Sequence, residues 1–300
     1  MDLIMKMKSK SDRIFDIINY TLLGIIFFIV AYPLYFVVIA SISDPNMVNA
    51  GKTLLWPRGI TFEGYAKILE YKEILVGYKN SIIYTLVGTI INLVVLIPAS
   101  FALSRKELVG RGFFSAVCLF AMYFSGGVVP LYLLIRNMGM FDTIWALVLP
   151  GAFSVNNMLI CRSFFVGNVS EELFESVKID GGGYMRFFFS IVLPLSKSII
   201  AVMCLYHALG HWNGYLNVLY YMRDPNKYNL QLILKNLTES ISTKTLATAG
   251  VSAEYLASMQ KLNEMVKYST ILIAALPMII LYPFVQKHFV TGVMIGSVKG

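Results

Sequence analysis

The chain has 300 residues, of which 57% are hydrophobic and 14% are charged, and its formal net charge is +8. This composition is too apolar for a water-soluble domain and indicates several membrane spans. Beyond a small N-terminal cluster the basic residues form no long block, so the positive charge indicates membrane topology and excludes a nucleic-acid partner.

Apolar runs of about 20 residues, the length that crosses a bilayer as a helix, predict an all-α integral membrane protein with six transmembrane helices. In chain order these are Ile17–Ile42, Ser81–Leu103, Phe113–Ile135, Thr143–Phe165, Ile191–His211 and Tyr268–Phe289. The first run is too long for the apolar part of a signal peptide and lacks a clear cleavage site. Pro33, Pro130 and Pro150 lie inside the first, third and fourth spans, where kinks are expected.

The distribution of Lys and Arg predicts that both termini face the cytoplasm. Short cytoplasmic loops carry an excess of basic residues, and residues 1–16 and 104–112 are the most basic short segments. Residues 166–190 and 290–300 are then cytoplasmic as well. The outer side receives two longer segments, Ser43–Asn80, with a predicted short helix at Phe62–Glu73, and Trp212–Lys267.

One cytoplasmic segment, Ser170–Pro194, interrupts the apolar pattern with acidic residues, namely Glu171, Glu172, Glu175 and Asp180. At about 100° per residue the three glutamates share one helical face, and Leu173, Phe174 and Val177 share the opposite face. Ser170 is expected to cap the helix through its side chain, and the glycines at 181–183 are expected to end it. The sequence predicts a short amphipathic helix that contacts a partner in the cytoplasm.

The motifs of catalysis and of ion coupling are missing from the sequence. There is no GxxxxGK[ST] phosphate loop, and no histidine has a carboxylate or cysteine at metal-ligand spacing. The three cysteines stand alone in apolar runs. Because the predicted spans contain almost no ionisable residues, no proton or sodium relay is indicated. We expect no enzyme activity, no cofactor and no metal site, and an energy source in another subunit.

Several polar or aromatic residues at or near membrane depth could line a substrate path. They are Asn92, Asn156, Asn157, His207, Trp212, Asn213 and Tyr215. Sugars bind by stacking on aromatic rings and by hydrogen bonds to groups that donate and accept. Each of these residues could instead join neighbouring helices, which is the commoner role of an intramembrane Asn.

The acidic segment carries a family resemblance. Glu175–Gly181, followed after nine residues by Ile191-Val192-Leu193-Pro194, resembles the EAA-xxx-G-(x)9-I-x-L-P motif of permease subunits of bacterial ABC importers. Ser176 and Val177 depart from the two alanines that are usual there. The Asp180-Gly181 pair is similar to the sugar-importer branch of this family.

Two further stretches extend the resemblance over roughly residues 76–300. His211-Trp212-Asn213 with Tyr215 is similar to the stretch after the fifth span of carbohydrate permeases. The ending Gly292–Gly300 resembles the tail of maltose-type permeases that reaches the ATPase dimer interface. In detail the chain resembles permeases for polysaccharide-derived oligosaccharides.

The resemblance implies a type I ABC importer permease fold with a coupling helix at about 171–183. The residues implied to couple to the ATPase are Glu172, Glu175, Ser176, Val177, Asp180, Gly181 and Pro194, and those of the tail are Gly296, Ser297 and Lys299. The implied partners are a second homologous permease, two ABC ATPase subunits, an extracytoplasmic binding protein, a carbohydrate and membrane lipid. The implied location is the cell membrane.

The expected organisation has three parts. Residues 1–75 hold the N-terminal cytoplasmic segment, the first span and an outer loop; residues 76–289 form the importer transmembrane domain with five helices; residues 290–300 form a cytoplasmic tail. The alternatives are the permease of a non-sugar ABC importer, or an ion-coupled carrier or channel, which the missing buried charges disfavour. The resemblance also allows the second permease alone to hold the sugar, and the sequence does not name that sugar.

Overall fold

The computed structural model describes residues 10–246 and 253–296, and this part of the chain contains helices, turns and loops but no strand. The helices of the N-terminal half are α1 (Lys10–Ser41), α2 (Pro45–Asn49), α3 (Glu63–Glu70), α4 (Lys72–Ser104), α5 (Arg111–Tyr123), α6 (Val128–Asn137) and α7 (Ile144–Val148). Those that follow are α8 (Val155–Asn168), α9 (Glu171–Ile179), α10 (Tyr184–Phe187), the π-helical turn η1 (Phe188–Val192), α11 (Leu193–Leu195), α12 (Lys197–Asn213), α13 (Tyr215–Tyr221), the 3-10 turn η2 (Pro225–Lys227), α14 (Leu230–Leu246) and α15 (Ala253–Gly296).

The chain divides into two compact units. The first comprises Met1–Glu70 with Thr238–Ile273, and the second comprises Tyr71–Leu237 with Ala274–Gly300. Each unit combines segments that are far apart in the sequence. The three-part organisation expected from the sequence stays a prediction.

In the first unit, polar contacts hold the segments around the C-terminal end of α1 together. The Asp44 carboxylate accepts a hydrogen bond from the Asn46 N–H (2.8 Å) and lies 3.4 Å from Lys261 Nζ of α15. The Tyr65 hydroxyl of α3 donates to Ser41 Oγ (2.6 Å). A Cβ at Gly64 would lie 2.7 Å from the Met265 carbonyl oxygen, so α3 and α15 approach too closely for any other residue there.

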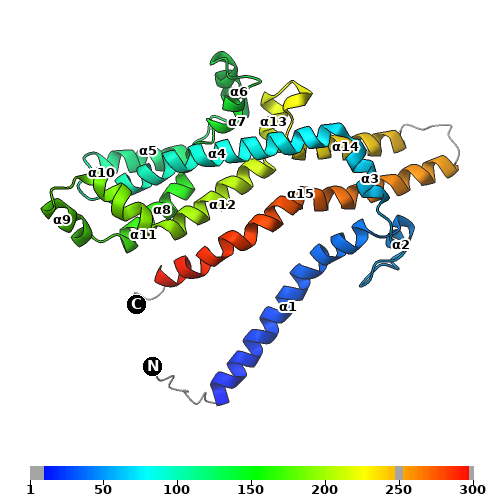
Figure 1. The fold of residues 1–300 in the computed structure, drawn as a ribbon, viewed down its shortest axis with the longest axis horizontal. Helices are drawn as coiled ribbons and strands as arrows, with labels where there is room; N and C mark the ends of the chain where they lie inside the picture. The colour runs from blue at the N-terminus through cyan, green and yellow to red at the C-terminus, as the bar shows by residue number, and fades with distance from the viewer. Residues whose placement is uncertain (1–9, 247–252, 297–300) are drawn as a thin grey trace. The chain divides into compact units, whose positions relative to one another are not determined.

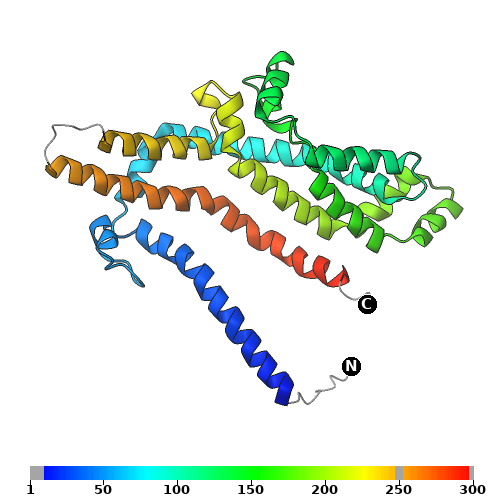
Figure 2. The same cartoon turned by 180° about the vertical axis from the view of Figure 1, so that it is seen from behind.

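The second unit is built around α4, which has 33 residues. It lies side by side with α12 in both ribbon views, and α8 also packs against it (Figure 1, Figure 2). Four buried rings, which we call the aromatic base, gather near the C-terminal end of α4: Phe101, Phe165, Phe187 and Phe188. The Phe101 ring centroid lies 5.9 Å from that of Phe165 and 5.2 Å from that of Phe188. The aromatic base joins α4, α8 and the segment that precedes α12.

Three of the described helices are long and apolar enough to cross a membrane, with spans at Ser11–Ser41, Lys72–Ser104 and Asn263–Pro283. Two bent pairs, α5 with α6 and α10–α11 with α12, raise this number to five if each pair is one span. The expected count of six spans stays a prediction. The α4 helix begins nine residues before the expected start at Ser81, and α12 begins at Lys197 instead of Ile191.

The expected third span, Phe113–Ile135, is not one helix kinked at Pro130. The α5 and α6 helices meet at an angle of 112°, and the break falls at Phe124–Gly127. Gly127 has φ +85° and ψ −179°, a conformation that is essentially restricted to glycine. Pro130 lies in the first turn of α6, where a missing N–H costs no helical hydrogen bond. The glycine therefore sets the bend.

The expected fourth and fifth spans are also interrupted. Thr143–Phe165 is split into α7 and α8 by residues 149–154, a gap that contains Pro150. The fifth is bent by 79° between Leu195 and Lys197, directly after the π-helical turn and Pro194. Proline lacks the N–H that a continuous helix would need at that point. The segment Trp212–Lys267, expected as an outer loop, contains α13, α14 and the start of α15 in its described part.

Candidate functional site

The α9 helix has the two faces that the sequence predicts. Glu171, Glu172 and Glu175 are exposed, whereas Val177 is buried with 8% of its surface accessible. Leu173 and Phe174, on the same side as Val177, are half-buried. The apolar face rests on the chain's own core and leaves the acidic face directed outward.

Aromatic contacts fix α9 on the aromatic base. The Phe174 ring stacks on Tyr184 with centroids 4.1 Å apart and planes inclined by 20°. Its centroid also lies 5.3 Å from that of Phe187. Such pairs contribute about 0.5–1.5 kcal/mol beyond the apolar area they bury. Because Tyr184 and Phe187 belong to α10, these contacts join α9 to the segment that leads into α12.

The glycines after α9 form a defined helix end. Gly181 has φ +74°, its N–H donates to the Lys178 carbonyl (3.1 Å), and the Gly182 N–H donates to the Val177 carbonyl (2.8 Å). This pair of hydrogen bonds is the Schellman motif. A Cβ at Gly182 would lie 2.6 Å from Val177 Cγ1, so the glycine makes room for the valine that replaces the family's usual alanine.

The start of α9 differs from the sequence prediction in two ways. Ser170 has the extended backbone of an N-cap, but its hydroxyl accepts no hydrogen bond from the helix, so the expected side-chain cap is wrong. Glu171 Oε1 instead lies 3.2 Å from Lys106 Nζ, in an exposed ion pair. Glu172 and Glu175 remain as the acidic groups most open to a partner.

Arg105, which follows α4, has a structural role that sequence reasoning missed. Its guanidinium donates to the carbonyls of Phe165 (3.4 Å) and Val169 (3.3 Å) and lies 5.2 Å from the Phe101 ring centroid. The last carbonyls of a helix lack intrahelical partners, and a cation satisfies them well. Arg105 therefore joins the ends of α4 and α8 next to the aromatic base. Its position in a basic loop indicated only topology.

A second group of candidates forms a polar cluster among α4, α8 and α12. Asn92 Nδ2 donates to the Gly151 carbonyl (2.7 Å) and lies 2.9 Å from His207 Nδ1, while His211 Nε2 lies 3.0 Å from Asn92 Oδ1. Asn157 Nδ2 lies 3.3 Å from His207 Nε2. The cluster thus unites Asn92, Asn157 and His207 from three helices. It also includes His211, which was noted in the sequence only as part of the stretch after the fifth span and not as a substrate-path residue.

The hydrogen bonds within this cluster determine the state of His207. Since the Asn92 amide nitrogen donates to Gly151, it also presents a donor to His207 Nδ1, which must accept. An imidazole that accepts at Nδ1 is neutral and carries its proton on Nε2. The Asn157 atom that faces Nε2 is the amide nitrogen (3.3 Å), so the geometry assigns the acceptor role to Nδ1 alone. His207 therefore contacts α4 through Nδ1 and α8 through Nε2.

The remaining substrate-path candidates lie apart from this cluster. Trp212 is 2% exposed, and its indole N–H donates to the Ala274 carbonyl of α15 (3.0 Å). Asn156 and Asn213 are exposed, and Tyr215 is half-buried. Asn213 borders an apolar cavity of about 450 Å³ between α12 and α15. Trp212 thus supports helix packing, whereas Asn156 and Asn213 are exposed and Tyr215 is partly accessible.

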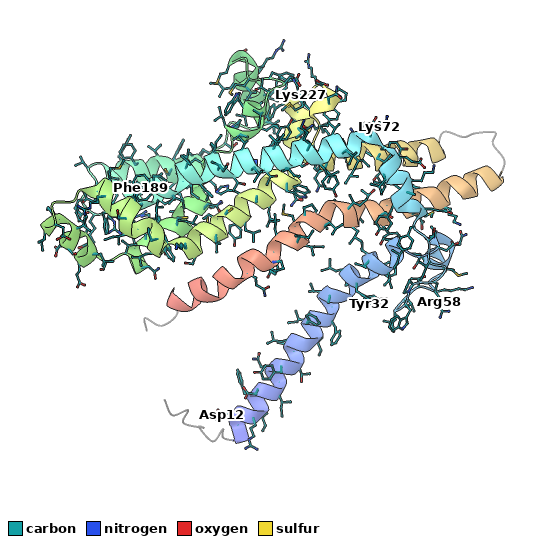
Figure 3. All side chains as sticks on the ribbon, in the orientation of Figure 1. Asp12, Tyr32, Arg58, Lys72, Phe189 and Lys227 are labelled. Atoms are coloured by element: carbon teal, nitrogen blue, oxygen red, sulfur yellow. The ribbon has the colours of Figure 1, made fainter. Side chains whose placement is uncertain are left out.

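Asp142 is the centre of an unpredicted junction in the second unit, near the labelled Lys227 (Figure 3). Lys227 Nζ donates to Asp142 Oδ2 (2.7 Å), and the Arg223 N–H donates to Asp142 Oδ1 (3.0 Å). Asp142 is the one non-glycine residue of the described chain with positive φ, at +59°. These contacts join the α6–α7 loop to the α13–η2 segment, and the Tyr84 hydroxyl ties Lys227 to α4 (2.9 Å).

We expect Asp142→Ala to lower the thermal stability of the chain more than Asp142→Asn. Both remove the charge, but Asn tolerates positive φ and keeps one acceptor. Loss of hydrogen bonds to a charged group costs about 1.5–3 kcal/mol. Thermal unfolding in detergent measures the difference, with Glu63→Ala, an exposed acidic residue on α3, as the control. Equal unfolding temperatures for Asp142→Ala and the unmodified chain would contradict the assigned role.

The same junction predicts a pH dependence. The hydrogen bond from Lys227 lowers the pKa of Asp142, burial opposes this, and the N–H groups of Arg223 and Asp224 lower it further. A carboxyl group with a lowered folded pKa stabilises the fold above its unfolded pKa, and this contribution is lost as pH falls through the folded value. The Asp142→Asn effect should therefore be constant near neutral pH and vanish only in acid.

The tail residues implied to contact the ATPase are only partly placed. Gly296 is the last residue of α15, and Ser297 and Lys299 lie outside the described residues. Pro194 lies in α11, directly after the π-helical turn.

Several long apolar helices, joined by hydrogen bonds between buried polar groups, define a multi-pass integral membrane protein. No protein-family model matches the chain. Protein LplC of Bacillus subtilis (strain 168) is 34% identical over 292 residues, which is 97% of this chain and 97% of that protein. The polygalacturonan/rhamnogalacturonan transport system permease protein YtcP of the same organism is 33% identical over 293 residues, covering 96% of this chain and 99% of YtcP.

A solved structure agrees with these relatives. A chain in the crystal structure of a bacterial ABC transporter involved in the import of the acidic polysaccharide alginate matches with a TM-score of 0.78 and 31% identity. The match covers 95% of this chain and 100% of that chain. The protein belongs to the permease subunits of carbohydrate ABC importers, which are non-catalytic, multi-pass proteins of the cell membrane.

Proposed function

We propose that this permease imports polysaccharide-derived oligosaccharides and is driven by a separate ATPase through α9. The observation that carries the proposal is the orientation of α9. Its apolar side is held on the aromatic base of the same chain, while Glu172 and Glu175 face outward. A helix buried on one side and acidic on the other suits a basic cleft of a soluble partner better than an anionic lipid surface.

The proposed assembly contains a second homologous permease, two ATPase subunits and an extracytoplasmic binding protein. In this proposal both termini lie in the cytoplasm, so α9 and the tail with Gly296, Ser297 and Lys299 face the ATPases. Residues 76–289 form the transmembrane domain, preceded by residues 1–75 and followed by the tail. The coupling residues are those of the motif, Glu172, Glu175, Ser176, Val177, Asp180, Gly181 and Pro194.

The contacts of α9 offer a mechanical route to the membrane. Closure of the ATPase dimer would displace α9, and the stack of Phe174 on Tyr184 would pass the displacement to α10. The π-helical turn and the 79° bend then lead into α12, whose His207 and His211 contact α4 and α8. A displacement of this kind would favour one of two states of the translocation path.

The names of the relatives support the substrate class. YtcP is named for polygalacturonan and rhamnogalacturonan transport, and the solved structure concerns an importer of an acidic polysaccharide. The substrate-path candidates divide into two groups by their contacts. Asn92, Asn157, His207 and Trp212 join helices. Asn156 and Asn213 are exposed, and Tyr215 is partly accessible. We propose that only the latter group contacts sugar, if this permease and not its partner holds it.

The test is the ATPase activity of the complete importer reconstituted in nanodiscs with its binding protein. Uronic-acid oligomers should stimulate hydrolysis, whereas their monomers and free amino acids should not. Omission of the binding protein is the control and should remove the stimulation. Stimulation by an amino acid or phosphate, with no response to any oligosaccharide, would contradict the proposed substrate class.

A further inference from the structure

The segment between α2 and α3 forms a short loop, and both ends of this loop lie near the last turn of α1. The Lys52 N–H donates to the Met47 carbonyl (3.0 Å) at its start. At its end, the Arg58 carbonyl accepts from the Asp44 N–H (2.9 Å) and the Arg58 N–H donates to Ser43 Oγ (3.2 Å). Residues 53–57 therefore form a loop whose two ends are held together.

The tip of this loop is tied to the side of α1. The Tyr32 hydroxyl donates to the Leu54 carbonyl (3.2 Å), and the Tyr35 hydroxyl donates to the Leu55 carbonyl. In both ribbon views the chain after α2 turns back beside the C-terminal part of α1 (Figure 1, Figure 2), and Figure 3 labels Tyr32 and Arg58 at the two ends of this region. The loop thus folds back along a helix that is long and apolar enough to span the membrane.

The position of the tyrosines sets the depth of the tip. Tyr32 and Tyr35 precede the end of α1 at Ser41 by nine and six residues, which at 1.5 Å per residue is roughly 14 Å and 9 Å. Helical side chains tilt towards the N-terminus of the helix, so the two hydroxyls are shifted from their own Cα atoms towards that end of α1. Because α1 is apolar up to Ala40, Leu54 and Leu55 lie beside the apolar part of the helix and not beside its polar C-terminal end.

The tip residues are exposed and apolar. Leu54, Leu55 and Trp56 are 57%, 61% and 74% exposed, and the basic residues Lys52 and Arg58 on either side are exposed as well. Three consecutive large apolar side chains with more than half of their surface exposed do not suit water. Trp at the boundary of apolar and polar layers, with cationic neighbours, is the composition of a membrane interface.

We propose that the Leu54–Trp56 tip inserts into the lipid leaflet at the C-terminal end of α1 and holds this segment in the membrane interface. This is the outer leaflet in the orientation proposed above. Only the choice of leaflet rests on that orientation. The tip carbonyls of Leu54 and Leu55 already accept hydrogen bonds, which removes much of the cost of leaving water. Lys52 and Arg58 then lie at headgroup level, where they attract anionic phosphates.

Lipid fits this surface better than a second protein because of what surrounds the tip. The adjoining face of α1 is exposed along most of its length, with 6% of its most apolar window buried, so the tip continues an exposed apolar surface on a helix long enough to span a membrane. Interfacial segments insert about 5–10 Å into the headgroup and acyl boundary, which agrees with the roughly 9 Å that Tyr35 sets at Leu55, and Leu54 reaches deeper, to roughly 14 Å at Tyr32. The tip therefore extends the membrane surface of α1.

The test compares the tryptophan emission of the full chain and of Trp56→Phe in nanodiscs of ordinary or brominated phospholipid. Trp145 and Trp212 are present in both proteins, so the difference spectrum isolates Trp56. Brominated lipid should remove most of the Trp56 emission, and aqueous iodide should remove little. Strong quenching by iodide, or protection from both quenchers by a covering protein, would overturn the proposal. None of these outcomes depends on the substrate or on ATPase coupling.

A spin label provides a second measurement that does not depend on Trp56. The label is placed at Leu55→Cys in a chain whose three native cysteines are replaced by serine or alanine. A label in the interface should collide more often with oxygen than with a water-soluble nickel complex. The same label at Glu63→Cys, exposed at the start of α3, should show the reverse preference. Equal preferences at both positions would contradict insertion.

Discussion

Glu175→Arg is expected to reduce substrate-stimulated ATPase activity and uptake by about tenfold or more, because loss of a desolvated charge contact costs about 2–5 kcal/mol and 1.4 kcal/mol is a factor of ten. Glu175 is exposed on the outward side of α9, so the substitution does not disturb the aromatic base. A basic cleft on the ATPase would then face a cation. Reconstituted transport with a fixed amount of each subunit measures the effect.

Two further variants make this result specific to α9. Glu63→Arg reverses an exposed charge on α3, in the first unit, and should leave coupling unchanged. Glu175→Gln removes the charge without reversing it and should give an intermediate loss. Unaltered coupling of hydrolysis to substrate in Glu175→Arg would refute the proposed role of the acidic face.

Gly88→Ala is expected to destabilise the packing of α4 against α12 by about 1–3 kcal/mol, the usual cost of overpacking, and to impair transport. A Cβ at this position would lie 2.4 Å from His211 Nε2. The imidazole would have to leave, and Asn92 would lose the partner of its oxygen. Thermal unfolding and uptake of the variant give the two readouts.

A double-mutant cycle separates this steric effect from a general effect of alanine. His211→Ala removes the ring, so Gly88→Ala should cost much less in that background than in the unmodified chain. Gly112→Ala on α5, where a new Cβ meets nothing within 4 Å, is the matched control. Equal costs of Gly88→Ala with and without His211 would show that the close approach has no energetic effect.

The sequence was enough to predict the two faces of α9 but not the contacts at the two ends of the helix. The acidic and apolar faces of α9 follow from a period of 3.6 residues and are confirmed by the burial of Val177. The side-chain cap by Ser170 is wrong, because whether a hydroxyl turns toward the helix depends on competing contacts. The space that Gly182 leaves for Val177 could not be predicted, since it depends on how the chain turns after the helix.

Interruptions of the third and fourth spans were expected at prolines, and in the third span the position was wrong. Prolines were expected to bend the third span, yet the break lies at Phe124–Gly127 and Pro130 fits within a helical turn. A bend of this kind depends on the φ and ψ of one glycine, and the sequence has 22 glycines that could adopt the conformation. The split of the fourth span near Pro150 agrees better, because proline removes a helical hydrogen bond wherever it occurs in a helix interior.

The sequence by itself determined the membrane class, the helical architecture, the approximate spans and the acidic helix that carries the family motif. These properties follow from the length, composition and period of local segments, which do not depend on distant residues. Only the tertiary structure decided that Asn92, Asn157, His207 and His211 form one cluster, and that α9 rests on the aromatic base. Such contacts join residues far apart in the chain, and they exist only because particular helices lie side by side.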